Sequence, residues 1–150
     1  MRSVYDNIKL AKAVAPQSVA TTATPTTSAV FAVDTFGFNS GMFEVFAGTP
    51  TGTTVTYSIS VQITECATSG GTYTDVSGAT GTITGFGTAL AEHCQIRVEG
   101  LGSDRKRYLK AVIVPTLSVA DKVITVSAVA LLGRSFKEPP SNAASAVAAA

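Results

Sequence analysis

The residues best placed for surface chemistry in this sequence form a short cluster of cations. Four of the chain's eleven basic residues lie in residues 102–115, GSDRKRYLKAVIVP, directly against an apolar run: Arg105, Lys106, Arg107 and Lys110. The Gly-Ser-Asp before them is typical of a turn, because an Asp side chain can accept a hydrogen bond from the backbone two residues on. The first three cations should therefore mark the entry to a strand, and only Lys110 continues into it.

Three roles are open for this cluster. It can be a solvated strand end, a salt-bridge donor in a subunit or partner interface, or a nucleic-acid contact. A β-surface that binds nucleic acid needs basic residues interleaved with stacking aromatic side chains, and Tyr108 is the one aromatic residue in reach along the sequence. The sequence therefore favours the first two roles, and no nucleic-acid partner is expected.

Catalytic and metal-binding constellations are missing from the sequence pattern. The single histidine, His93, has only Glu92 beside it, on the opposite side of an expected strand, whereas a base or a metal site needs converging partners. Cys66 and Cys94 have no metal-ligand spacing, and we expect two free, partly buried thiols, with a disulfide left open. No G-x-S-x-G elbow occurs, and GTITGFG at residues 81–87 has no following helix or lysine. We expect no catalytic residue, metal or cofactor, and no enzyme.

Composition indicates one β-rich domain. The 150 residues carry a formal net charge of +1, only 14% are charged, and the 45% hydrophobic residues are interleaved with Thr, Ser and Gly. Neither a polyanionic partner nor a membrane is expected, because the charge is small and no run of about 18 apolar residues occurs. Asp6, Lys9 and Lys12 interrupt the stretch where a signal peptide would be apolar, so we expect synthesis in a cytoplasm.

Alternation of apolar and polar residues predicts the elements that carry these side chains. Val55, Tyr57, Ile59, Val61 and Ile63 take every second position of one strand. Similar signals predict strands at residues 28–33, 42–47, 72–76, 82–86, 94–98, 108–114 and 122–132. The expected fold is all-β, an antiparallel sandwich or barrel of about eight strands with jelly-roll or immunoglobulin-like topology.

The two ends of the chain differ from this pattern. Residues 1–28 are rich in Thr with two prolines and predict an extended N-terminal arm, residues 29–136 the sandwich, and residues 137–150 a short C-terminal tail. The segments 108–114 and 123–132 are apolar on both faces, which hints at a subunit contact. The apolar residues of the arm are expected to anchor it on a partner, or else to pack on their own domain: Val4, Tyr5, Ile8, Leu10 and Val14.

Several short blocks occur in a familiar order: YDNIKLAKAVAP at 5–16, VDTFGFNS at 33–40, ITEC at 63–66, GTYTDV at 71–76 and GSDRKRYLK at 102–110. This order, over about residues 5–133, resembles small virion structural proteins encoded in the head genes of tailed bacteriophages. In that family a V-D-T-x-G-F/Y-D-S block leads a strand and a G-S-K-R-Y-L/I-R strand comes near the end. The chain departs from it at residues 66–71, which lack the family's paired aspartates.

The resemblance implies a capsid decoration (cement) protein or minor capsid protein. Such a protein is a β-sandwich, commonly a homotrimer, that binds the major capsid protein on the outside of the virion after assembly in the host cytoplasm, and stabilises the head by bridging capsid subunits. The alternative is a carbohydrate- or cell-surface-binding module of a tail or head fibre. The chain has no Trp to stack on sugars, which counts against that alternative.

Overall fold

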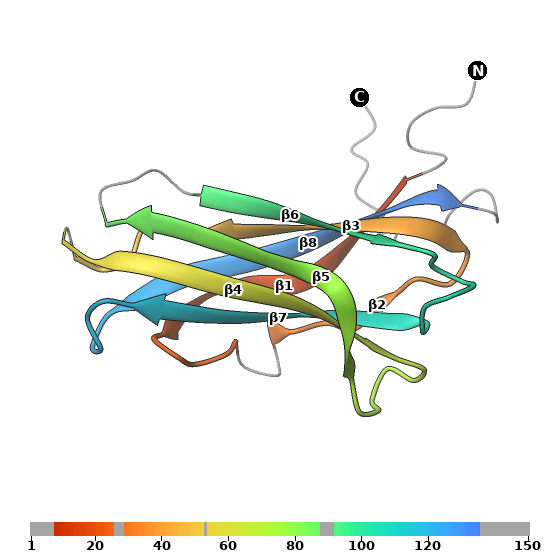
Figure 1. The fold of residues 1–150 in the computed structure, drawn as a ribbon, viewed down its shortest axis with the longest axis horizontal. Coiled ribbons are helices and arrows are strands. Elements are labelled where there is room, and N and C mark those ends of the chain that lie inside the picture. Colours follow the sequence, from red (N-terminus) through yellow and green to blue (C-terminus); the bar gives the residue numbers. More distant parts are fainter. Residues whose placement is uncertain (1–7, 26–28, 53, 88–91, 136–150) are drawn as a thin grey trace, which may run out of the picture.

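The computed structural model describes residues 8–25, 29–52, 54–87 and 92–135, which form two antiparallel four-stranded sheets packed as a β-sandwich (Figure 1). The eight strands are β1 (Ile8–Ala20), β2 (Val33–Asp34), β3 (Phe38–Ala47), β4 (Thr56–Cys66), β5 (Thr74–Phe86), β6 (Glu92–Glu99), β7 (Tyr108–Leu117) and β8 (Val123–Ser135). The expected all-β sandwich of about eight strands is confirmed. Among the described residues, no helix is long and apolar enough to cross a membrane.

The strand order identifies the topology. The first sheet has the order β1-β8-β3-β6 and the second the order β2-β7-β4-β5. Strand β1 therefore pairs with β8, β2 with β7, β3 with β6 and β4 with β5, as in a long antiparallel ribbon that has been folded over on itself. This is the jelly-roll arrangement of two four-stranded sheets, one of the two topologies expected from the sequence.

The core lies between the two sheets and is built from the alternating strands. Along β4, Tyr57, Ile59, Val61 and Ile63 are at most 5% exposed, as their period-two spacing predicts. From the first sheet, Phe43 and Val45 of β3 and the even-numbered residues 124–132 of β8 meet them. One continuous apolar core therefore holds the sandwich together.

The expected N-terminal arm is largely a core element, which corrects the boundary placed at residue 28. Residues 8–20 form β1, which pairs along its length with β8 from Ile8–Gly133 to Ala20–Val123. The sequence pattern hid this strand because its register shifts between Lys12 and Val14 and again between Val14 and Gln17. These irregularities break the period-two alternation and make room for Pro16 at the edge of the sheet. Residues 137–150, the expected tail, lie outside the described residues.

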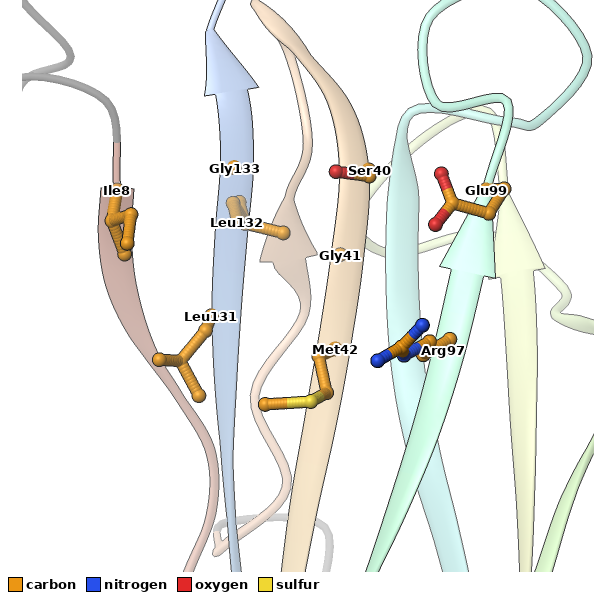
Figure 2. A pocket seen from close by; sticks show the side chains of 9 residues that line it. All are labelled: Ile8, Ser40, Gly41, Met42, Arg97, Glu99, Leu131, Leu132 and Gly133. Carbon is orange, nitrogen blue, oxygen red and sulfur yellow. The ribbon is translucent and has the colours of Figure 1, made fainter. Parts of the chain in front are cut away.

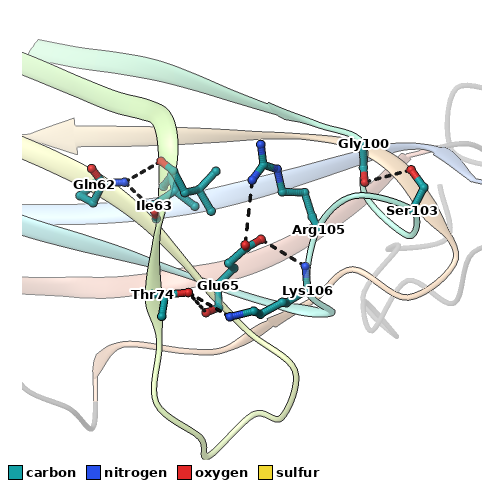
Figure 3. A network of polar contacts seen from close by, with 9 residues as sticks. Gln62, Ile63, Glu65, Thr74, Gly100, Ser103, Arg105 and Lys106 are labelled. Atoms are coloured by element: carbon teal, nitrogen blue, oxygen red, sulfur yellow. Dashed lines mark hydrogen bonds and ion pairs between the residues drawn. The ribbon is translucent and has the colours of Figure 1, made fainter.

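The two short strands expected at residues 72–76 and 82–86 are one long strand, β5, with a wide bulge. Between the pairs Gln62–Thr80 and Thr64–Asp75, four residues of β5 stand opposite the single Ile63 of β4. The Gln62 side-chain amide donates a hydrogen bond to the carbonyl oxygen of Ile63 at 2.7 Å (Figure 3). It also donates to the carbonyl oxygens of Val76 at 3.0 Å and Ala79 at 3.4 Å. The sequence therefore predicted the correct number of strands although it missed β1 and divided β5 into two.

Strand β2 is much shorter than the strand expected at residues 28–33. It comprises Val33 and Asp34 and pairs only with Tyr108 and Leu109 of β7. Beyond that point β7 has no sheet neighbour on this side among the described residues, and such an edge tolerates a proline like Pro115. The backbone N–H of Thr22 donates to the Pro115 carbonyl oxygen at 2.7 Å and partly covers this edge.

The sandwich narrows where β5 of the second sheet lies beside β6 of the first (Figure 1). A side chain at Gly81 would approach Ile96 and Cys94 within 3.1 Å, and one at Gly85 would overlap the Tyr57 ring. Gly81 therefore permits this close approach of the two sheets, whereas Gly85 leaves room for the Tyr57 ring of its neighbour β4 in the same sheet.

Candidate functional site

The outer face of the first sheet presents side chains in lateral rows that cross all four strands. One row reads Leu10, Leu131, Met42 and Arg97 on β1, β8, β3 and β6, because each residue pairs with the next across the sheet. The adjacent row reads Lys12, Val129, Glu44 and Gln95. The first row is apolar over β1, β8 and β3 and charged on β6. The second row has only Val129 as an apolar residue, between Lys12 and Glu44.

This surface concentrates exposed apolar side chains. Leu10 is 62% exposed, Phe46 41% and Ile8 37%, and these are three of the six large hydrophobic residues that are exposed in the described part of the chain. Half-buried side chains on β3 and β8 lie between them: Met42, Val129 and Leu131. We call these six residues the apolar strip. Contiguous apolar surface of this kind is typical of protein-binding sites.

Two hollows flank the central row of the strip. The first, of about 290 Å³, lies over Gly133 and Ser40, which leave space between Ile8 on β1 and Glu99 on β6 (Figure 2). The second, of about 460 Å³, lies over Ser127 between Leu10 and Phe46. Small residues in the middle of the outer rows thus give the strip a ridge with a depression on either side.

The residues expected to anchor an arm are distributed over three environments. Ile8 and Leu10 lie in the apolar strip, where they are available to a partner. Val14 is 2% exposed and packs in the core of its own domain, so it cannot anchor the chain on another protein. Val4 and Tyr5 lie outside the described residues.

The basic segment lies at one end of the second sheet, and its strongest contact is an ion pair. Arg107 donates two hydrogen bonds to the Asp34 carboxylate, Nε to Oδ1 at 2.8 Å and Nη2 to Oδ2 at 2.7 Å. The Arg107 hydrogen bond, aided by the backbone N–H of Phe36, holds the pKa of Asp34 below its usual range. This bidentate pair connects β7 to the end of β2.

The other cations of the segment contact the hairpin between β4 and β5 (Figure 3). The Arg105 guanidinium Nη1 lies 3.9 Å from Glu65 Oε1, and the backbone N–H of Lys106 donates to Glu65 Oε2 at 3.1 Å. The Lys106 ammonium donates to Thr74 Oγ1 at 3.0 Å. The turn itself is formed by the backbone N–H of Asp104, which donates to the Gly100 carbonyl at 2.9 Å, with Gly100 and Gly102 at positive φ.

Three aromatic rings surround these cations, which corrects the expectation that Tyr108 is the only one in reach. Lys110 Nζ lies 4.3 Å from the centre of the Tyr73 ring, and the Arg107 guanidinium lies 4.9 Å from Phe36 and 5.1 Å from Tyr108. Phe36 and Tyr73 are distant in sequence, so the linear pattern could not reveal them. Each of the four cations thus has an intramolecular partner, and the segment ties β2, the β4–β5 hairpin and β7 together.

The histidine and the cysteines do not converge. His93 Nε2 lies 3.4 Å from Glu44 Oε1 on the neighbouring strand β3, a partner that local sequence could not indicate. Both thiols are free; the backbone N–H of Thr68 lowers the pKa of Cys66, and burial raises that of Cys94. Within the ranges the structure describes, no group of three His, Cys, Asp or Glu residues is arranged to hold a metal ion.

Comparison of the sequence with protein-family models and with curated proteins finds no match. Function must therefore be argued from the surfaces of this chain. The sequence drew attention to Ile8 and Leu10, and its two-faced apolar segment 123–132 indicated Val129 and Leu131. It did not single out Met42, Phe46 or Arg97, which join them only through the pairing of β3 with β8 and β6.

Proposed function

We propose that this chain is a virion structural protein that binds the outside of a bacteriophage capsid and stabilises the head by bridging major capsid subunits. The observation that carries the proposal is the apolar strip, in which Leu10, Phe46 and Ile8 stand exposed on an otherwise regular sheet. A jelly roll is found in viral capsid proteins and in lectins alike, so the fold alone does not choose between them. The ordered sequence blocks that resemble phage head proteins support the capsid.

The chemistry of the strip suits a protein partner. Its centre is apolar and its β6 side carries Arg97 and Glu99, which matches the apolar core and polar rim of protein interfaces. A sugar-binding surface would instead offer a free aromatic platform. Tyr73, Tyr108 and Phe36 face cations of their own chain. The exposed rings of Phe46 and Phe86 lie on different sheets, so they do not form a shared platform.

The proposal includes self-association, with the homotrimer that the resemblance implies. Copies that bind side by side on a shell gain avidity, so modest contacts per copy suffice for stable attachment. Sedimentation of the purified chain measures the oligomeric state directly.

The strip is tested with the double variant L10D/F46D. Complete burial of a Leu or Phe side chain contributes about 1.5–3 kcal/mol, and the exposed portions of Leu10 and Phe46 together represent about 2 kcal/mol, or about 30-fold in Kd for each copy. The assay is cosedimentation of the chain with phage heads from which it has been removed. We expect the double variant to lose attachment.

The matched control is F86D, because Phe86 is 46% exposed but lies at the end of β5 on the other sheet. It should attach as the unchanged chain does. Full attachment of a folded L10D/F46D variant would refute the role of the strip. Absence of any attachment by the unchanged chain, together with saturable binding to a glycan array, would favour the fibre module instead.

A further inference from the structure

A third hollow lies on the side of the sandwich where β5 and β6 run beside each other. Its volume is about 250 Å³, and two arginines from separate elements line it, Arg97 of β6 and Arg105 of the loop before β7. The bulge of β5 at residues 77–79 forms the opposite wall, and Glu99 stands on the rim. Two arginine residues and one glutamate therefore line this hollow.

The two guanidinium groups keep most of their hydrogen-bonding capacity. The Arg97 side chain makes no hydrogen bond or ion pair with any part of the chain that the structure describes. Within the described ranges, the Arg105 guanidinium has Glu65 as its partner at 3.9 Å, a long contact to a carboxylate that already accepts the Lys106 N–H at 3.1 Å. Arg107, in contrast, directs two donors at Asp34. A guanidinium has five N–H donors in a planar fork, so Arg97 and Arg105 have donors to offer a ligand.

Hydrogen bonds and strand pairing hold the backbone around the hollow in place. The Gln62 amide fixes the β5 bulge by bonding to the Val76 and Ala79 carbonyl oxygens, on either side of residues 77–78. Arg97 stands on β6, whose every residue pairs with β3. The Arg105 backbone lies between the Gly100–Asp104 turn and the Lys106 N–H bond to Glu65. The backbone positions of both arginines are thus set by elements that pack independently of any ligand.

The carboxylates nearest the two arginines, Glu99 at the hollow and Glu65 at 3.9 Å from Arg105, leave most of the guanidinium N–H donors without an acceptor. A planar or tetrahedral oxyanion offers the acceptor geometry that arginine forks match. We propose that the hollow between Arg97 and Arg105 is a binding site for an oxyanion, either a carboxylate or a phosphate group. The site shares Arg97 and Glu99 with the border of the apolar strip, but anion binding by the isolated chain is tested without attachment to a capsid.

The test uses the full chain labelled with ¹⁵N and titrated, at constant ionic strength, with sodium phosphate in one arm and sodium acetate in the other. Saturable shifts of the amide signals of residues 77–79 and 97–99, with a Kd of about 1–10 mM for one or both anions, support the site. The anion that saturates at lower concentration identifies the preferred group. Shifts that fail to saturate in both arms, or that sodium chloride reproduces, would overturn it.

Variants assign the binding to the two arginines. R97Q and R105Q should each weaken binding by about tenfold, because each removes charge-assisted hydrogen bonds. E99Q should tighten it by about two- to fivefold, since a repelling carboxylate is removed from the rim. K122Q is the control, because Lys122 lies in the β7–β8 turn beside Asp121, and its affinity should not change. Unaltered affinity in R97Q, R105Q or E99Q, with the spectrum of a folded chain, would show that the anion binds elsewhere.

Discussion

Replacement of Gln62 by alanine should destabilise the protein more than its surface position suggests. The Gln62 amide is the donor that satisfies the carbonyl oxygens of Ile63 and Val76 where the β5 bulge interrupts the ladder between β4 and β5. Two of its hydrogen bonds are short, at 2.7 and 3.0 Å, and the third, to Ala79, is 3.4 Å. In Q62A these acceptors lose their partner while the bulge keeps them out of the regular ladder.

The expected loss follows from these two short bonds. A hydrogen bond contributes about 0.5–1.5 kcal/mol net, so the free energy of unfolding should fall by about 2 kcal/mol. For a chain of this size that corresponds to a Tm lower by about 4–8 °C and a urea midpoint lower by about 1 M. Urea unfolding followed by circular dichroism measures the change.

A second variant places a negative charge in the same environment. In Q62E the new carboxylate faces carbonyl oxygens and has no proton to donate, so at pH 7 the variant should be less stable than Q62A. Burial against these oxygens raises the pKa of the new carboxyl group, and protonation restores a donor. The difference in unfolding free energy between Q62E and the unchanged chain should therefore shrink as the pH falls below about 5.

The matched control is Q95A, because Gln95 is an exposed residue of the same type on β6. Its unfolding free energy should stay within about 0.5 kcal/mol of the unchanged chain, as for most surface substitutions. A Q62A variant that is equally unaffected would show that the bulge does not depend on the amide, and the reasoning above would be wrong.

Two further predictions concern close packing and pH. G85A should lower the free energy of unfolding by about 1–3 kcal/mol, since a methyl group there overlaps the Tyr57 ring. The control G70A, whose methyl group meets no atom within 4 Å, should be nearly neutral in the same urea titration. Equal urea midpoints for the two variants would contradict the clash. D34N should be less stable than the unchanged chain at pH 7, because the Arg107 pair lowers the pKa of Asp34 and so stabilises the folded state above the unfolded-state pKa of about 3.9. This difference should vanish as the pH falls through the lowered folded-state pKa, and a difference that is constant from pH 7 to pH 2.5 would exclude the ion pair as its cause.

The fold was predictable where side-chain alternation is strict. Strand β4 has an uninterrupted period of two, and its apolar residues are buried as expected. The sequence pattern missed strand β1 because two register shifts break its period of two. It predicted β5 as two strands because the bulge inserts extra residues, which strand propensities do not indicate. Irregular pairing is decided by partners in other strands, such as Gln62 for β5, and these partners are not adjacent in sequence.

The candidate surfaces were predictable only in part, for a related reason. The sequence indicated the cations at 105–110, but it could not show that Asp34, Glu65 and Tyr73 come from other segments to meet them. It placed Leu10 in an arm, and the structure places the same residue in a row with Leu131 and Met42. Lateral neighbours in a sheet are set by register, which a single sequence determines only through the complete set of strand pairings.

The apolar strip and the oxyanion site share residues along β6, and this shapes how a partner could use them. Arg97 ends the row that begins with Leu10, and it also lines the hollow that contains Arg105. Glu99 borders both that hollow and the one over Gly133. Apolar burial supplies most of the affinity of an interface, whereas charges at its rim mainly set specificity and association rate. A protein that covers the strip and presents a carboxylate beside β6 would therefore gain its register from Arg97 and Arg105. The strip alone would leave it free to slide along the sheet.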